Sequence, residues 1–205
     1  MTGIVLNVEK REKIGTGGAR ATRNSGRIPG VLYGGTRGSI PIEINAKDVE
    51  TAIRTRRTHK AFGAEPVDRE TLTELLELAT WAPNHRLTNP WRFRVVGPRA
   101  LAALKAADPE RAKKLDRAPT LVAVSVVRTP DDPEAEEEDT LAAGCALYAL
   151  LLGAHGRGLA AYWRTPWVLR QPAGLAALGI PPTEHVLGLV HLGPLRQEKP
   201  APERA

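Results

Sequence analysis

The sequence has 205 residues, of which 42% are hydrophobic and 25% are charged, and its formal net charge is +6. This composition is typical of a globular protein and excludes the fibrous and disordered classes. The length suffices for one core with a small appendage. A single cysteine, Cys145, excludes an internal disulfide, and the only long apolar run, residues 141–152, is too short to span a bilayer. We therefore expect a protein of the reducing cytoplasm, with no membrane segment and no signal sequence.

The positive charge lies at one end of the chain. Residues 1–60 contain 12 Lys or Arg and 5 Asp or Glu, a net charge of +7, whereas residues 61–205 contain 17 and 18, a net charge of −1. Such a concentration is found in proteins that bind nucleic acid or another polyanion, and equally in a solvated basic face. Charge alone leaves both interpretations open.

The first 45 residues predict short strands joined by turns. Apolar residues alternate over residues 4–8 and 39–44, and a brief apolar run closed by glycines covers residues 30–35. The glycine-rich basic stretch over residues 15–27 is predicted as a loop. Three short strands make a poor core, so we do not expect this segment to be stable alone.

From Asn45 onward the apolar period changes to that of helices. Asn45 and Asp68 are predicted N-caps of two helices, and Pro98 starts a third. Strands are predicted over residues 91–96, 120–127 and 185–193, and the second of them is apolar on both faces.

A long apolar helix is predicted over residues 140–155, after an acidic stretch, residues 131–139, that we expect to be a solvated turn. The helix is apolar around most of its circumference, so we expect neighbours to bury it, with Gly144 and Cys145 as packing residues. A short helix follows over residues 173–179, and the tail from residue 194 lacks an apolar period. The mixture of helices and strands predicts an α+β layer architecture.

Common catalytic and metal motifs are absent from the sequence. The five histidines are scattered without cysteine or carboxylate neighbours at ligand spacing, which argues against a metal site. No phosphate-binding loop, nucleophile elbow or dinucleotide fingerprint is present. The catalytic residues therefore stay unassigned, and no side-chain acid or base can be named.

Three segments in order carry the most specific signal: RRTHKAF at residues 56–62, WAPNHRLTNPWRF at residues 81–93 and AGCALYALLLGAHGRGLAAYWRTP at residues 143–166. Each alone has a structural explanation, because basic residues favour helix C-termini and tryptophans fill cores. Together, over residues 48–193, they resemble the FMN-dependent nitroreductase family, especially its small single-domain members. The resemblance implies a nitroreductase-like FMN-binding fold.

The resemblance also assigns candidate site residues. Arg56, Arg57 and Thr58 supply guanidinium groups and a hydroxyl suited to the FMN phosphate. By resemblance, FMN is approached by Trp81 and His85 from a second subunit and by Trp163, Arg164 and Thr165 from the first. The NAD(P) nucleotide is expected near Gly153, Ala154, His155, Gly156, Arg157 and Gly158.

The implied activity is that of an FMN-dependent NAD(P)H oxidoreductase. NAD(P)H would reduce the flavin, and a small oxidant such as a nitroaromatic or quinone would reoxidise it in a ping-pong cycle. The resemblance further implies a homodimer with the active site at the subunit interface. The chain departs from the family at Thr58 and Lys60, where relatives often have Ser and Arg, and in stopping where relatives usually continue.

Residues 5–35, VLNVEKREKIGTGGARATRNSGRIPGVLYGG, resemble the start of the bacterial 5S-rRNA-binding large-subunit ribosomal protein of the general stress protein Ctc family. That resemblance implies RNA contacts by Arg20, Arg23 and Arg27. We predict a chimera of a partial, β-rich segment over residues 1–48 and a nitroreductase-like FMN domain over residues 49–205, with a loose tail from residue 194. Sheet edges of the first segment would be left unpaired. The alternative function is therefore 5S rRNA binding through the basic N-terminal segment.

Overall fold

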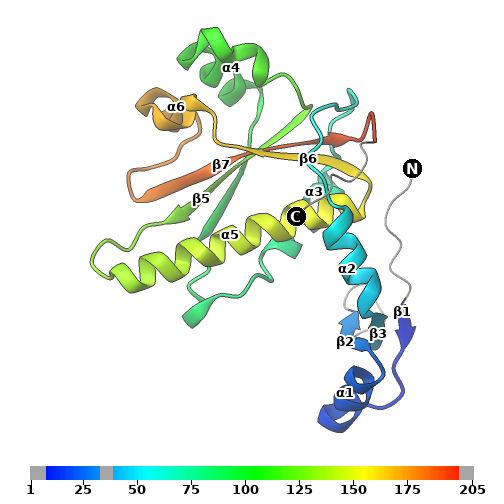
Figure 1. Ribbon diagram of the computed structural model, residues 1–205. Coiled ribbons are helices and arrows are strands. Elements are labelled where there is room, and N and C mark those ends of the chain that lie inside the picture. The colour runs from blue at the N-terminus through cyan, green and yellow to red at the C-terminus, as the bar shows by residue number, and fades with distance from the viewer. Residues whose placement is uncertain (1–7, 33–38, 199–205) are drawn as a thin grey trace, which may run out of the picture. The chain divides into compact units, whose positions relative to one another are not determined.

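The structure is a computed structural model that describes residues 8–32 and 39–198 (Figure 1). The chain forms two compact units, which we call the small unit, Ile4–Arg56, and the large unit, which contains Arg57–Ala205. Each unit has its own antiparallel sheet. The predicted join of the two sequence types near residue 48 stays a prediction, because compactness and sequence ancestry are different properties.

The small unit contains, in chain order, β1 (Val8–Lys10), α1 (Gly15–Asn24), β2 (Arg27–Leu32), β3 (Ile40–Asn45) and α2 (Ala46–Thr55). β3 is the central strand of a sheet with the order β1-β3-β2, and Ile44 lies opposite both Val8 and Ile28. The predicted strand over residues 39–44 is confirmed, whereas most of the one predicted over residues 4–8 lies outside the described residues. Asn45 caps α2 as predicted, since its Oδ1 accepts a 3.0 Å hydrogen bond from the Lys47 amide.

The glycine-rich stretch predicted as a loop is the helix α1 instead. Glycine is a poor helix former on average, but Gly18 is required here because a Cβ would lie 2.2 Å from the Lys13 carbonyl oxygen. Thr22, one turn further, is buried and donates to the Gly18 carbonyl at 3.1 Å and to Glu43 Oε2 at 3.3 Å. Close packing of Gly18 against the Lys13 backbone therefore outweighs the low helix propensity of glycine, on which the prediction of a loop rested.

The described residues of the small unit form almost no apolar core. Ile42 is the only buried apolar side chain among its described residues, while Val8 and Ile28 on the same face are 44% and 38% exposed. On the other face Arg27 forms ion pairs with Glu9 and Glu43, each at 2.5 Å. The small number of buried apolar side chains agrees with the poor core predicted from the sequence. The ion pairs of Arg27 hold the strands together in addition to that core.

The large unit contains the remaining elements: α3 (Arg69–Ala79), η2 (His85–Leu87), β4 (Trp91–Val95), α4 (Pro98–Ala107), η3 (Pro109–Lys114), β5 (Thr120–Val127), α5 (Pro133–Gly156), β6 (Leu159–Arg164), η4 (Trp167–Arg170), α6 (Pro172–Ala177) and β7 (Glu184–Pro194). Its sheet has the order β4-β5-β7-β6 with every neighbouring pair antiparallel. Strand β6 is an element that the sequence analysis did not predict. The predicted helix cap Asp68 is confirmed, because its carboxylate accepts a 2.8 Å hydrogen bond from the Thr71 amide.

Helices cover both faces of this sheet, which gives three layers (Figure 1). On one face Val122, Val124 and Val126 of β5 pack against α3 and α5. On the other face Leu121 and Ala123 pack with residues from α4, η4 and α6. β5 is buried on both sides, as predicted, and the α+β class is confirmed.

Helix α5 begins at Pro133, seven residues before the predicted start. The acidic stretch expected to be a turn is therefore mostly helical, with the Asp132 carboxylate accepting a hydrogen bond from the Ala135 amide at 3.1 Å. Acidic side chains in the first turn of a helix interact favourably with its positive end, so the charge run suits this position. Cys145 is exposed rather than part of the core, so one face of α5 lies uncovered.

The end of the described chain is held by the beginning of the large unit. Phe62 forms a bridge with Leu195, and the Gly63 amide donates to the Pro194 carbonyl at 2.8 Å. Residues 194–196 are thus tied down, while residues 199–205 lie outside the described part. No helix of the described residues is long and apolar enough to cross a membrane.

Candidate functional site

The first residues of the large unit run along the end of β6. The His59 amide donates to the Ala161 carbonyl at 3.3 Å, and the His59 side chain is buried. Arg57 is half-buried just before it and Thr58 is exposed. The sequence motif that begins in the small unit at Arg56 therefore ends beside an edge strand of the larger sheet.

Two cations flank the ring of Tyr162 on β6. Lys60 Nζ lies 5.4 Å from the ring centroid, and the guanidinium carbon of Arg164 lies 5.6 Å from it. Cations placed over an aromatic face are attracted by its negative quadrupole. No salt bridge joins either cation to a carboxylate of the described residues, so the pair forms a site where an anion would be attracted.

Behind this pair His191 on β7 is fully buried, with its ring centroid 5.9 Å from that of Tyr162. Burial, helped by the charges of Arg164 and Arg117, lowers the pKa of His191 from 6.5 to about 4. The imidazole is consequently neutral at physiological pH. The positive charge of the region comes from the lysine and arginines alone.

The end of β6 reaches the surface at the predicted Trp-Arg-Thr segment. Trp163 is 44% exposed, and its Nε1 donates to the Leu187 carbonyl at 3.1 Å. A Cβ on Gly188, which has a φ of +154°, would lie 2.3 Å from Trp163 Nε1. Glycine at the bulge in β7 therefore allows the Trp163 indole to lie against β7. Thr165, the first residue after β6, is exposed.

Trp81 and His85 lie on the surface loop between α3 and β4, which is strained and runs beside α5. Trp81 is 76% exposed, and His85 Nδ1 lies 2.8 Å from Glu138 Oε2 of α5. Arg86, Leu87 and Asn89 all have positive φ values, which cost free energy in residues with a Cβ. The loop is held by Asn84, whose Oδ1 accepts from the Asn89 amide at 2.7 Å and whose Nδ2 donates to Thr88 at 2.9 Å.

Trp81 also borders an apolar groove on the exposed face of α5. The groove has a volume of about 670 Å³ and is lined by Leu78, Trp81, Ala82, Pro83, Thr140, Leu141, Gly144, Cys145, Tyr148, Ala149 and Leu152. Leu141 is 64% exposed there. Monomeric proteins rarely expose a contiguous apolar surface of this kind without a binding role.

Residues 153–158, which were predicted to lie near the NAD(P) nucleotide, are partly buried and partly exposed. Gly153 and Ala154 are buried in α5, and a Cβ on Gly153 would lie 2.6 Å from Leu78 Cδ2. Gly156 is exposed, and Arg157 forms a 2.9 Å ion pair with Glu74. The first two residues of the stretch therefore serve the packing of α3 on α5.

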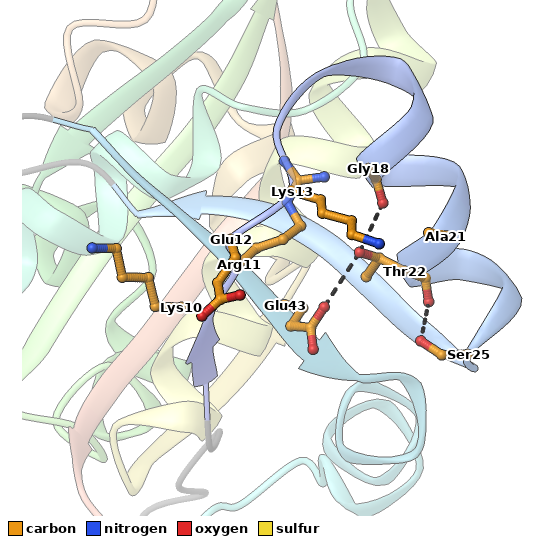
Figure 2. Close-up of a pocket in the computed structure, with 9 residues that line it drawn as sticks. All are labelled: Lys10, Arg11, Glu12, Lys13, Gly18, Ala21, Thr22, Ser25 and Glu43. Atoms are coloured by element: carbon orange, nitrogen blue, oxygen red, sulfur yellow. Dashed lines mark hydrogen bonds between the residues drawn. The ribbon is translucent and has the colours of Figure 1, made fainter.

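The small unit has a separate pocket of about 370 Å³ next to α1 (Figure 2). It is lined by Lys10, Arg11, Glu12, Lys13, Gly18, Ala21, Thr22, Ser25 and Glu43. Nε and Nη1 of Arg11 are buried and have no hydrogen-bond partner among the described residues. Of the predicted RNA contacts, Arg20 and Arg23 are exposed on α1, whereas Arg27 is engaged by Glu9 and Glu43.

Comparison with known protein families supplies the deciding observation for the large unit. The model of the nitroreductase family matches residues 53–194, which is most of the chain. The chain belongs to the nitroreductase family. This assignment makes the large unit an oxidoreductase of the nitroreductase type and agrees with the fold class predicted from its motifs.

Individual relatives of the nitroreductase unit agree with that assignment. An NAD(P)H nitroreductase by name, from Haemophilus influenzae, is 30% identical over 161 residues, which cover 71% of this chain and 88% of the relative. The crystal structure of a nitroreductase-like family protein from Bacillus cereus matches with a TM-score of 0.69 at 25% identity, over 77% of this chain and 90% of that one. A Desulfovibrio desulfuricans protein, described as a nitroreductase and crystallised in complex with FMN, matches with a TM-score of 0.65 at 29% identity, over 77% and 91%.

The small unit is similar to a different family. The Ribosomal L25p family model matches residues 6–79, and the large ribosomal subunit protein bL25 of Phenylobacterium zucineum is 54% identical over 55 residues. That match covers 27% of this chain and 26% of the relative, so the chain spans about a quarter of the length of that ribosomal relative. The two-part resemblance seen in the sequence is thereby confirmed, with an L25-like N-terminus preceding the nitroreductase unit.

Proposed function

We propose that this protein is an FMN-dependent NAD(P)H oxidoreductase that reduces small acceptors such as nitroaromatics or quinones. The observation that carries the proposal is the pair Lys60 and Arg164 around Tyr162, two cations without a carboxylate partner among the described residues. They stand at the edge of a nitroreductase unit. A flavin nucleotide brings an anionic phosphate, which such cations would attract.

When bound, FMN accepts a hydride from NAD(P)H and passes electrons to the acceptor. In our proposal Arg56, Arg57 and Thr58 hold its phosphate. Trp163, Arg164 and Thr165 line the flavin from the same subunit. The protein's part is to bind and orient the flavin, and no side-chain acid or base is assigned.

We further propose that the active enzyme is a homodimer in which a second copy covers the apolar groove on α5. Support comes from the groove's apolar lining and from the exposure of Leu141 and Trp81 beside it. Burying such a surface is favourable at roughly 25 cal/mol per Å². Trp81 and His85 would then reach the flavin of the partner subunit, which explains why they lie on an exposed loop.

Purified protein tests the enzyme proposal directly. We expect a yellow protein that releases FMN on denaturation and oxidises NAD(P)H only when a quinone or nitroaromatic is added. Arg57→Ala should lower FMN occupancy, whereas Arg69→Ala, which removes an exposed arginine at the start of α3, is the matched control. A colourless protein whose unfolding temperature does not rise with added FMN would contradict the proposal, because a bound ligand must stabilise the folded state.

The small unit favours a second candidate function, binding of RNA phosphates. The specific observation is the pocket beside α1, where Lys10, Arg11 and Lys13 gather and Arg11 has buried donor atoms without partners in the described part of the chain. Arg20 and Arg23 project from α1 as further cations, while the ion pairs of Arg27 leave it to stabilise the sheet.

Selectivity distinguishes this second function from general attraction to polyanions. We expect 5S rRNA to bind more tightly than unrelated RNA of equal length, and Arg11→Ala to weaken the binding more than Arg54→Ala on α2. If affinity is equal for both RNAs and falls steeply as salt rises, only nonspecific electrostatic attraction is present.

A further inference from the structure

Two adjacent carboxylates of α5 fasten the loop between α3 and β4. His85 Nδ1 donates to both oxygens of Glu138, at 2.9 Å to Oε1 and 2.8 Å to Oε2. The next residue of α5, Asp139, is buried, and its Oδ1 accepts a 2.5 Å hydrogen bond from Thr88 Oγ1. The loop is therefore held on the helix at two points, one on each side of residues 86 and 87.

The two contacts differ in their surroundings. Asp139 is 6% exposed, so its contact with Thr88 lies at the edge of the core and anchors the loop. The side chains of His85 and Glu138 are 59% and 36% exposed. Exposed ion pairs contribute little to the free energy of unfolding, because water screens them. Stability therefore does not account for a carboxylate placed on His85.

The backbone directly after His85 is strained. Arg86, Leu87 and Asn89 have φ values of 57°, 52° and 48°, in the left-handed region that costs free energy for residues with a Cβ. Such residues are found mainly where a fold must hold a neighbouring side chain in one functional position. The strain and the carboxylate both act on the placement of His85.

The contact with Glu138 determines which ring nitrogen of His85 is available. A carboxylate only accepts hydrogen bonds, so the proton of the neutral imidazole lies on Nδ1 and the lone pair on Nε2. Nε2 makes no hydrogen bond to any residue within 8–32 and 39–198. His85 thus presents a hydrogen-bond acceptor to its surroundings in one fixed orientation.

This acceptor lies next to the surface proposed to bind a second copy of the chain. Thr140 and Leu141 directly follow Glu138 and Asp139 on α5, and both line the apolar groove. Trp81, on the same loop as His85, lines the groove from the other side of the sequence. A second copy in the groove would therefore face the loop that carries His85.

We propose that Glu138 is a positioning residue of the flavin site. It holds the proton on His85 Nδ1, so that Nε2 accepts a hydrogen bond from an N–H or hydroxyl group of the FMN bound to a second copy. The inference rests on the proposed function, in which His85 reaches the flavin of the partner subunit. It adds a residue of α5 that no sequence motif indicated, and it assigns one atom of His85 and one direction of hydrogen bonding.

Nitrogen NMR of the histidine rings in the full chain tests the proton position without flavin or turnover. At a pH where the imidazole is neutral, we expect His85 to carry its proton on Nδ1, with the signal assigned by its loss in His85→Ala. Glu138→Ala should give a mixture of both tautomers, whereas Glu138→Gln, which keeps an acceptor oxygen, should retain the Nδ1–H form. Glu137→Ala removes the same charge from an exposed neighbouring position and is the matched control.

The affinity for FMN, measured by titration of flavin fluorescence, tests the role of the pair. Glu138→Ala should weaken FMN by about tenfold, Glu138→Gln by less, and Glu137→Ala should have no effect. His85→Ala should weaken FMN by at least as much as Glu138→Ala. The double variant should bind FMN as His85→Ala does, because Glu138 acts only through His85. Unfolding temperatures confirm that each variant is folded.

Failure of this inference can be told apart from failure of the proposed function. The inference alone is overturned by a flavin-containing, active protein in which His85 carries its proton on Nε2. It is equally overturned if Glu138→Ala weakens FMN as much without the His85 side chain as with it, since Glu138 would then act through the loop and not through His85. A protein that binds no FMN would overturn the proposed function and the flavin contact together. The NMR measurement recognises that case, because the Nδ1–H form of His85 would still depend on Glu138.

Discussion

The small and large units differ in how much apolar surface their sheets bury. The four-stranded sheet of the large unit has a buried cluster on each face, and helices cover both. The three-stranded sheet of the small unit buries one apolar side chain, Ile42, among its described residues. A small sheet with one buried residue has little hydrophobic stabilisation to offset its conformational entropy. The contrast indicates that the large unit is stable through its core and the small unit through ion pairs and sheet hydrogen bonds.

The difference can be measured because all four tryptophans lie in the large unit. Tryptophan fluorescence therefore reports on the large unit alone, whereas amide hydrogen exchange over residues 40–45 reports on the small unit. We use these two signals to assign each expected effect to one unit.

The largest expected effect is on the core of the large unit. Leu147→Ala, at a fully buried position on α5, should lower the free energy of unfolding by about 3 to 5 kcal/mol through lost burial and the cavity left behind. Tryptophan fluorescence during urea unfolding measures it. Val95→Ala, at a position 53% exposed on β4, is the control and should cost much less. Equal losses in both variants would mean that the cluster around α5 does not stabilise the unit.

The next effect concerns the buried histidine of the large unit. Because burial and the nearby charges of Arg164 and Arg117 lower the pKa of His191 from 6.5 to about 4, the unfolded state takes up the proton first as the pH falls. The free energy of unfolding should therefore decrease by about 3 kcal/mol between pH 6.5 and pH 4, beyond the change from other groups. His191→Leu should flatten this part of the profile, measured by urea unfolding at several pH values. An unchanged profile in the variant would show that His191 is not held neutral.

A smaller effect is expected in the small unit. Ile42→Ala should cost about 2 kcal/mol, because the open sheet lets water or neighbours fill the space. This loss is nevertheless expected to unfold the unit, since no other apolar side chain is buried in its described part. Hydrogen exchange over residues 40–45 should become fast while the fluorescence transition stays in place. A parallel shift of both signals would show that the two units unfold together.

The smallest expected effect concerns the uncovered face of α5. Leu141→Glu places a charge in the apolar groove and should weaken the proposed dimer by about tenfold, measured by sedimentation over a range of concentrations. Ala103→Glu, which adds the same charge at an exposed position of α4 outside the groove, serves as a control for net charge. If the wild-type protein is monomeric at all concentrations, the groove does not bind a second copy.

Local signals in the sequence were sufficient for much of the fold. Asn45 and Asp68 were recognised as caps because a cap depends on a few neighbouring backbone groups. The strand over residues 120–127 was recognised because an unbroken apolar run suits a strand buried on both faces. Strand β6 was missed, since its alanine-rich sequence has no clear period of two.

The features that the sequence analysis predicted wrongly depend on contacts with residues outside the helix concerned. Gly18 suits a helix in α1 only because the Lys13 backbone passes so close to it. Cys145 was predicted to be buried because α5 is apolar all round, but the number of neighbours that a helix acquires is not written in its own sequence. In the same way, Gly153 and Ala154 belong to a glycine-containing stretch whose first residues face α3.

The sequence by itself determined the two-part character of this protein, the α+β class of the large unit and its resemblance to nitroreductases. These properties follow from the order of residues along the chain, and sequence motifs and apolar periods show that order directly. Tertiary structure alone decided that Lys60 and Arg164 meet over Tyr162, that Arg27 is engaged by two glutamates, and that Trp167 shares a depression with Lys114. Each of these pairs joins residues separated by many positions, and only the packing of strands and helices brings such side chains within range of one another.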